Sequence, residues 1–213
     1  MFEVYKKATL GHADYGWLKP RYHFSFASYY NPKKLGIGPL RVLNDDLVFP
    51  NGGFEPHPHK DMEIITYIIR GELTHTDSMG NTRKISRGSV QYMSAGTGVV
   101  HSEFNYGSEV LRLLQIWIHP NQKNLIPNYG DKQFEKSKRH NQLLHLVSNK
   151  DGNGAIQINQ DVNIYVIEID ENNKENVHLD QNRSIYLVQM EGSSLINDHL
   201  LEEGDALYTT ESI

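Results

Sequence analysis

Short runs of apolar and β-branched residues, separated by Gly, Pro and Asn, recur along most of the chain. The runs cover residues 40–48, 63–69, 73–76, 82–85, 89–93, 99–103 and 111–118, and again 143–147, 155–158, 162–169, 184–190 and 206–209. The aromatic stretch at residues 23–30 alternates weakly and also predicts a strand. No segment has the period of a long amphipathic helix. This pattern predicts an all-β sandwich or barrel.

The second half of the chain repeats the first. Residues 65–73 are echoed by 185–192, and residues 85–94 by 201–210. Each copy has an apolar strand, a Gly turn, a hairpin, and a further strand that follows a second Gly. Such a repeat predicts two versions of one β unit. The polar, Asn- and Lys-rich segment 121–141 is typical of an inter-domain connection. We therefore expect an N-terminal domain at 1–120 and a C-terminal domain at 142–213.

Three histidines and a carboxylate lie in two of the predicted strands. Side chains at positions i and i+2 of a strand share one face, so His57 and His59 point the same way, as do His101 and Glu103. If both strands face a common interior, these groups converge and can bind a divalent transition metal. Glu63 follows the histidine pair closely, and spacing alone does not choose between Glu63 and Glu103 as the fourth ligand.

Other conspicuous residues have simpler interpretations. The remaining eight histidines are interpreted as surface or packed side chains: His12, His23, His75, His119, His140, His145, His178 and His199. The aromatic residues Phe24, Phe26, Tyr29 and Trp117 are interpreted as core rather than as a substrate platform. The Gly96–Gly98 loop lacks the Lys-Ser/Thr of a phosphate-binding loop, so we expect it to bend the backbone into the His101 strand. In the second copy, 179–183 replaces the histidine pair, so no metal site is expected there.

Composition narrows the function classes. The chain has 213 residues, a net charge of −5 and no Cys. Lys and Arg are scattered, which argues against direct binding of nucleic acid. No apolar run reaches the roughly 18 residues of a membrane span, and no signal-peptide core follows the N-terminus. The absence of Cys excludes disulfides and thiolate metal sites and favours the cytoplasm.

The histidine strings resemble a known family. Residues 57–63 (HPHKDME) and 93–103 (MSAGTGVVHSE) are similar to the motifs of the pirin family, in particular the bacterial pirin-like quercetin 2,3-dioxygenases. Residues 41–46, 77–81 and 114–118 also match. The resemblance implies a bicupin with two jelly-roll domains, of which the C-terminal one is degenerate. Relatives usually continue past Ile213 with strands that close the second sandwich. The resemblance thus predicts a truncated domain whose open edge either pairs with a second copy or frays.

The resemblance also implies a site and an activity. The metal ligands would be His57, His59, His101 and Glu103, with Glu63 outside the ligand set and orienting a histidine. The metal would be one divalent transition ion, iron before nickel, manganese, cobalt, copper or zinc. A flavonol such as quercetin would bind through its 3-hydroxyl, and Glu103 would take the proton as the catalytic base. O2 would then open the ring with release of carbon monoxide.

Two other functions stay open at this point. One is a non-catalytic metal- or redox-sensing protein that binds a protein partner. The other is a small-molecule binding module without turnover. Fold alone does not decide among the three, because cupins host many chemistries.

Overall fold

The computed structural model describes residues 1–213 and consists almost entirely of strands. They are β1 (Phe2–Tyr5), β2 (Gly11–His12), β3 (Leu18–Tyr22), β4 (Leu40–Val48), β5 (Gly53–His59), β6 (Glu63–Arg70), β7 (Glu72–Asp77), β8 (Thr82–Ser86), β9 (Ser89–Ser94), β10 (Val99–Phe104), β11 (Leu111–Ile118), β12 (Asn128–Gln133), β13 (Leu144–Asn149), β14 (Ile156–Ile158), β15 (Ile164–Val166), β16 (Ile185–Val188), β17 (Ser193–Ile196), β18 (His199–Glu202) and β19 (Ala206–Thr209). Two short 3₁₀ helices are η1 (Lys7–Thr9) and η2 (Lys136–Lys138). No helix is long and apolar enough to cross a membrane.

The chain forms two compact units. The larger contains Gly11–Glu168, and the smaller combines Met1–Leu10 with Ile169–Ile213. The predicted division into domains at 1–120 and 142–213 stays a prediction.

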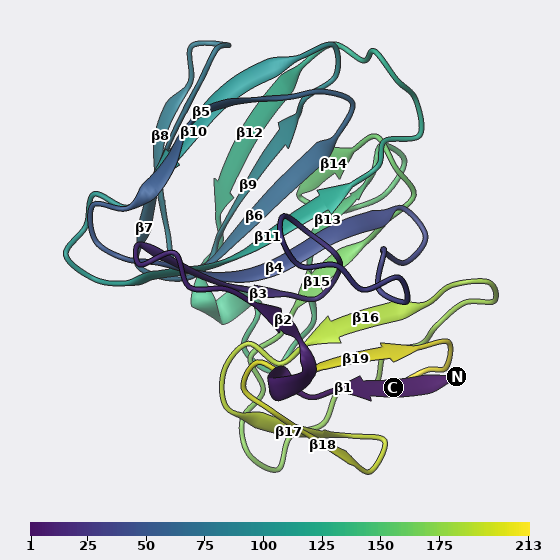
Figure 1. Ribbon diagram of the computed structural model, residues 1–213. Helices are drawn as coiled ribbons and strands as arrows, with labels where there is room; N and C mark the ends of the chain where they lie inside the picture. The colour runs from purple at the N-terminus through teal and green to yellow at the C-terminus, as the bar shows by residue number, and fades with distance from the viewer. The chain divides into compact units, whose positions relative to one another are not determined.

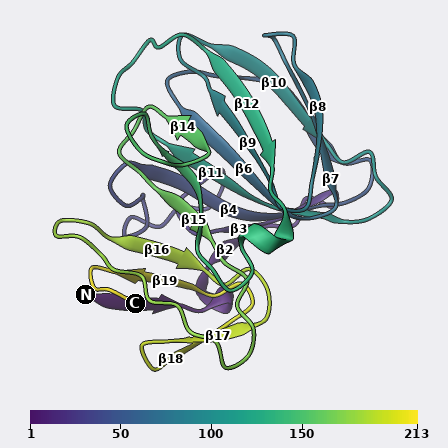
Figure 2. The same ribbon diagram turned by 180° about the vertical axis from the view of Figure 1, so that it is seen from behind.

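Two sheets make the sandwich of the larger unit (Figures 1 and 2). One has seven strands in the order β12-β9-β6-β11-β4-β3-β2, and the other has four in the order β5-β10-β7-β8. A separate three-stranded sheet has the order β14-β13-β15. The two larger sheets bring strands that are distant in sequence to opposite sides of one interior.

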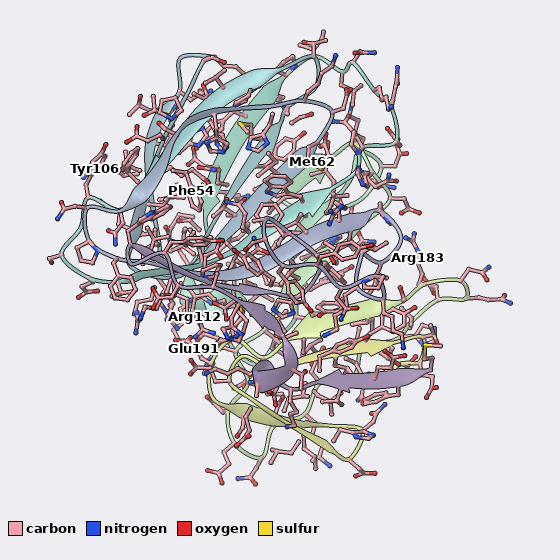
Figure 3. All side chains as sticks on the ribbon, viewed as in Figure 1. Phe54, Met62, Tyr106, Arg112, Arg183 and Glu191 are labelled. Carbon is pink, nitrogen blue, oxygen red and sulfur yellow. The ribbon has the colours of Figure 1, made fainter.

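The core lies between these two sheets, where side chains fill the space (Figure 3). One cluster of buried side chains draws on both sheets: Leu18, Val48, Ile68, Leu73, Ile85, Leu111 and Leu113. Burial of one such side chain stabilises the fold by about 1.5–3 kcal/mol. The cluster therefore holds the four-stranded sheet, which carries the histidines, against the seven-stranded one.

Most predicted strands are confirmed, but the strand at residues 23–30 is wrong. Only an isolated bridge between Phe26 and Tyr29 occurs there, and Ala27 has a positive φ of 48°. The backbone of Ser25 bonds instead to a neighbouring loop and to a side chain: its N–H donates to the Lys34 carbonyl at 2.6 Å, and Arg41 donates to its carbonyl at 2.8 Å. Hydrogen bonds to loops and side chains thus replace the strand pairing that the alternating sequence pattern predicted for residues 23–30.

Several strands fall where the sequence pattern gave no signal, among them β3 and β12. β3 pairs with β4, and β12 pairs with β9 inside the predicted connection. Both are half-polar strands at or near a sheet edge, and their pairing partners lie far away in sequence. Their formation therefore depends on the neighbouring strand rather than on local pattern.

The predicted internal repeat is confirmed by the strand pairing. β6 pairs with β9 and β7 with β8, while β16 pairs with β19 and β17 with β18. The corresponding turn glycines, Gly71 and Gly88 in one copy and Gly192 and Gly204 in the other, all have positive φ. Within the smaller unit, the N-terminal β1 pairs with the other side of β19 (Figure 1). That the remaining edge binds a second copy stays a prediction.

A buried ion pair in the smaller unit predicts acid sensitivity. Asp205 is only 4% exposed; burial raises its pKa, but hydrogen bonds from Lys6 and from the Lys7 and Glu202 amides outweigh this and lower it below the usual 3.8. A lowered carboxyl pKa stabilises the fold above that value, and the stabilisation is lost as pH falls. We expect the free energy of unfolding to fall below about pH 4 more steeply in the wild type than in Asp205→Asn. Urea unfolding of both proteins measures the difference, and equal slopes would contradict the expectation.

Candidate metal centre

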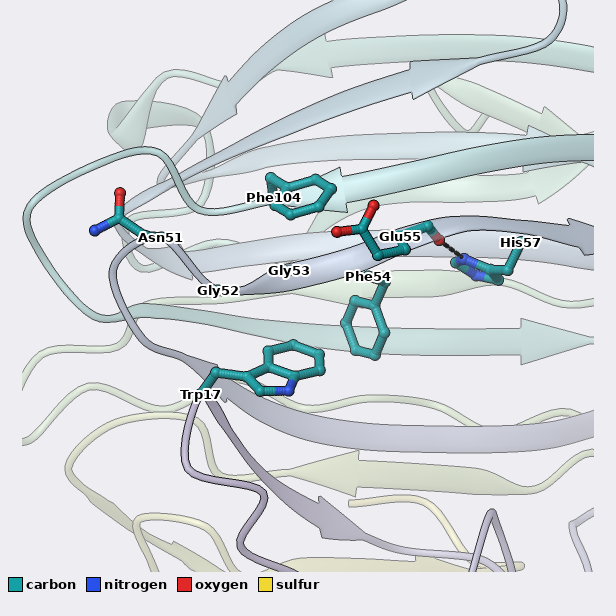
Figure 4. Close-up of a pocket in the computed structure, with 8 residues that line it drawn as sticks. All are labelled: Trp17, Asn51, Gly52, Gly53, Phe54, Glu55, His57 and Phe104. Atoms are coloured by element: carbon teal, nitrogen blue, oxygen red, sulfur yellow. Dashed lines mark hydrogen bonds between the residues drawn. The ribbon is translucent and has the colours of Figure 1, made fainter.

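Strand β5 presents the first two histidines. It is an edge strand of the four-stranded sheet, as Pro58, which lacks a backbone N–H, predicted. Alternation leaves Pro56 and Pro58 exposed and turns His57 and His59 inward, where they are half-buried. The Nδ1 atom of His57 lies 2.7 Å from the carbonyl oxygen of Glu55 (Figure 4). A proton on Nδ1 leaves Nε2 of His57 as the metal-binding atom.

Strand β10 presents the third histidine and the carboxylate. His101 lies directly opposite His57, and a β-bulge separates His101 from Glu103. Both side chains are buried, whereas Val100, directly before His101, is exposed. Gly96 begins the turn into this strand with φ of 45°, and any Cβ there would collide with the Leu125 carbonyl oxygen. The glycine loop therefore shapes the entry to β10, as the sequence predicted.

The three imidazoles meet in one place. The ring of His101 lies 4.5 Å from that of His57 and 4.9 Å from that of His59, and metal-binding atoms of all three lie within 4.8 Å of one another. Nε2 of His59 and both ring nitrogens of His101 are buried without a hydrogen-bond partner. An unpaired buried polar group costs roughly 1–3 kcal/mol. A cation in this position would satisfy these nitrogens, so the residues fit a metal.

The pKa values of two of these imidazoles favour the neutral form that binds a cation. Burial, aided by the neighbouring His101 and His57, lowers the pKa of His59 to about 4. Burial, aided by His57 and His75, lowers the pKa of His101 to about 3. Both rings are therefore neutral at neutral pH and keep a lone pair for a metal.

Glu103 sits beside this cluster rather than among its donor atoms. Its Oε1 accepts a hydrogen bond from Gln91 at 3.1 Å and its Oε2 one from Gln115 at 2.9 Å. Thr66 approaches Oε1 at 3.5 Å. The carboxylate forms a group within 4.8 Å with His101 and a further histidine, His75. The four predicted ligands thus lie in two groups that share His101, and their role as ligands stays a proposal.

A second buried carboxyl group lies near Glu103. Asp46 on β4 is completely buried, and burial, with the charges of Asp45 and Glu103, raises its pKa well above the usual value. Its neighbour Asp45 points to the other face and pairs with Arg112 at 2.7 Å. The protonated, uncharged form of Asp46 is therefore favoured by burial and by the neighbouring carboxylates.

Sequence reasoning interpreted His75 as a surface or packed side chain and Trp117 as core. It did not predict that both lie beside the histidine cluster. His75 is fully buried, with its ring 5.4 Å from that of His101. Trp117 packs its ring edge-on against His59 at 4.8 Å, with Phe26 on its other side. A signal for His75 existed: Leu73, His75 and Asp77 alternate along one face of a strand. No local signal places Trp117 beside a histidine 58 residues away.

The expectation that Glu63 orients a histidine is wrong. Glu63 is fully buried and accepts hydrogen bonds from Tyr92 at 2.9 Å and Ser94 at 2.7 Å. Asn159 donates to it from its backbone at 3.1 Å and from its side chain. On β6, Thr66 reaches Glu103, so Glu63, at odd spacing from it, points to the opposite face of the sheet. Glu63 therefore anchors the segment after β14.

Replacing Glu63 is therefore expected to lower the stability of the fold and not its metal affinity. Glu63→Ala leaves two hydroxyl donors unpaired, and we expect the free energy of unfolding to fall by about 3 kcal/mol or more, since each costs roughly 1–3 kcal/mol. Urea unfolding measures the loss, and calorimetric titration with Ni²⁺ measures metal affinity. The affinity should stay at the wild-type value in the folded variant. A lower Ni²⁺ affinity in Glu63→Ala than in the wild type would instead indicate that Glu63 belongs to the metal site.

A hollow of about 570 Å³ opens beside His57. Aromatic rings line much of it: Trp17 meets Phe54 edge-on at 5.1 Å, and Phe104 lies on the other side (Figure 4). Gly53 has no space for a Cβ against Phe104, so a larger residue would displace this wall. Cavities of 300–1,000 Å³ with apolar walls are typical of small-molecule sites. The hollow places an aromatic surface next to the histidine cluster.

Comparison with known proteins decides the family. The family model described as Pirin matches residues 3–118. The chain belongs to the pirin family. A second model, described as the quercetinase C-terminal cupin domain, matches residues 145–212 of this pirin. The two matches confirm the predicted all-β bicupin, with cupin domains in both halves.

Named relatives agree with the family. This pirin is 43% identical over 199 residues to a putative quercetin 2,3-dioxygenase of Pseudomonas aeruginosa, covering 93% of the chain and 86% of the relative. It is 38% identical over 209 residues to a quercetin 2,3-dioxygenase of Escherichia coli, covering 97% and 89%.

One similar solved structure contains a bound metal ion. The Escherichia coli pirin YhhW in complex with nickel(II) matches with a TM-score of 0.93 and 35% identity, over 100% of this chain and 92% of that one. Together with the histidine and carboxylate groups, it points to a divalent metal in this pirin.

Proposed function

We propose that this pirin is a metal-dependent dioxygenase that opens the heterocycle of flavonols such as quercetin with O2 and releases carbon monoxide. The ligands of the divalent ion, expected to be iron, are His57, His59, His101 and Glu103. One observation carries the proposal: imidazoles with unpartnered, buried nitrogens converge with His57, and His57 also lines an aromatic hollow. The names of the relatives support the substrate class.

The ion, when bound, supplies a positive charge that lowers the pKa of a hydroxyl group brought against it. The side chains divide the remaining work. Trp17, Phe54 and Phe104 receive a planar aromatic substrate on the side of His57. His57 is the imidazole that lines this hollow, and the 3-hydroxyl would lie at that end.

Glu103 is suited to take the hydroxyl proton. Two amide donors, Gln91 and Gln115, hold its carboxylate in place from the opposite sheet. Because each donates to a different oxygen, the carboxylate is fixed in orientation and keeps acceptor capacity on both atoms. A positioned general base contributes about 10²–10⁴-fold to rate.

Oxygen consumption tests the proposal. Protein loaded with one equivalent of Fe²⁺ is mixed with quercetin, and O2 uptake is followed together with loss of the flavonol absorption band and release of carbon monoxide. We expect the three to proceed together. Tight quercetin binding without O2 uptake would instead support a binding module. No turnover of any flavonol by fully loaded protein would overturn the enzyme assignment.

A further inference from the structure

A second group of metal-binding side chains lies beside the first. Donor atoms of His75, His101 and Glu103 lie within 4.8 Å of one another. Strand pairing brings them together, because His75 on β7 is directly opposite Glu103 on β10. The three residues are 0%, 2% and 3% exposed, whereas His57 and His59 are half-buried. The group is therefore the deeper of the two.

Asp77 prepares His75 to bind a cation. Its Oδ2 lies 3.1 Å from Nε2 of His75, and both side chains are inaccessible to solvent. The carboxylate accepts a hydrogen bond from Nε2–H of His75, so the lone pair is on Nδ1 of the ring. That Nδ1 atom is buried and has no hydrogen-bond partner. Carboxylate–histidine pairs of this kind are typical of metal ligands.

The surroundings fix both members of the pair. The ring of His75 stacks on Tyr129 at 4.8 Å. Oδ1 of Asp77 accepts the backbone N–H groups of Met79 and Asn81, at 2.9 and 3.1 Å. The geometry of His75 is therefore set before any ion arrives, and its free nitrogen is an unsatisfied acceptor in the interior.

We propose that His75, His101 and Glu103 form an inner seat for a divalent transition metal, sharing His101 with the outer group of His57, His59 and His101. Two imidazoles and one carboxylate are a donor set that first-row divalent ions accept. The inference rests on the proposed metal centre but not on its catalytic activity.

The inner seat gives Glu103 two states. With the ion in the inner seat, Glu103 is a ligand together with His75. With the ion in the outer seat, Glu103 would be the fourth and loosely held ligand, oriented by its hydrogen bonds from Gln91 and Gln115 and able to accept a proton. One carboxylate can thus serve both as ligand and as base.

Titration with Co²⁺ alone tests the inner seat, by calorimetry and by the visible absorption of the bound ion. The outer seat is removed with His57→Ala/His59→Ala, and this protein is expected to bind one Co²⁺ with an altered spectrum. Adding His75→Phe keeps a ring against Tyr129 and removes the donor. Adding Asp77→Asn instead places an amide donor opposite Nε2, which moves the ring proton to Nδ1. His75→Phe, which removes a ligand, is expected to weaken Co²⁺ binding by more than about 100-fold, and Asp77→Asn, which removes the support of that ligand, by about 10–100-fold.

His119→Gln is the matched control, because His119 is an exposed histidine outside both groups, and its affinity should equal that of the wild type. His75→Phe and Asp77→Asn remove the same donor by different routes, so a folding defect in one leaves the other to decide. Absence of Co²⁺ binding in His57→Ala/His59→Ala, or unchanged binding after either addition, would overturn the inner seat. Quercetin turnover is measured separately, so failure of the oxygenase assignment leaves this test intact.

Discussion

His101→Ala is expected to abolish divalent-metal binding and, with it, all metal-dependent turnover. His101 is the one histidine common to both groups of donors, and its ring lies between those of His57 and His75. Its removal leaves two imidazoles on one side and an imidazole with a carboxylate on the other. Of the proposed ligands, His57, His59 and Glu103 remain, but Glu103 is not grouped with these two histidines in the structure, so neither remainder is a set of three converging donors. The affinity for Ni²⁺, measured by competition with a chelator, should fall by well over about 100-fold, which is the upper range for losing a residue that only supports a ligand.

The fold should survive this change. The His101 ring packs against the rings of His57, His59 and His75, and its nitrogens make no hydrogen bonds. The alanine variant removes buried polar atoms that have no partner, so we expect its urea midpoint without metal to stay close to that of the wild type. His119→Gln provides the comparison for a histidine outside the site. Retention of stoichiometric Ni²⁺ binding by His101→Ala would place the metal elsewhere in the molecule.

Glu103→Gln is expected to lower quercetin turnover by about 10²–10⁴-fold at saturating metal, since it removes the general base. The substitution keeps the size of the side chain. Its new amide group must face Gln91 or Gln115, both of which donate to Glu103 in the wild type. One donor then lacks an acceptor, and the free energy of unfolding should fall by roughly 1–3 kcal/mol. Initial rates of O2 uptake and urea unfolding measure the two effects.

Glu63→Gln is the control that distinguishes loss of a general base from the general cost of replacing a buried carboxylate. Glu63 is likewise a fully buried carboxylate in a strand of the same sandwich, but its partners are Tyr92, Ser94 and Asn159. Its substitution should lower stability and leave the turnover of the folded enzyme unchanged. If the two variants lose turnover equally, the loss at Glu103 reflects disturbed packing, and its assignment as the base is wrong.

Glu63 and Glu103 show which features of the site could be predicted from the sequence and which could not. Alternation correctly turned His57, His59 and His101 inward, because the period of two is a property of the strand backbone itself. It left Glu63 and Glu103 equivalent as candidates. Their difference depends on which face of each sheet looks into the sandwich, and that is set by strand pairing. The bulge between His101 and Glu103 changes the register locally and is not visible in the sequence.

The sequence by itself determined most of the strands, the repeat, the family and the three histidines, since each follows from local alternation, turn glycines or contiguous motifs. Tertiary structure alone placed His75, Gln91 and Gln115 around Glu103, and put Trp117 against His59. These neighbours lie on strands that meet only when two sheets close over one interior. Side-chain contacts across that interior depend on sheet order and register, which no local stretch of chain encodes.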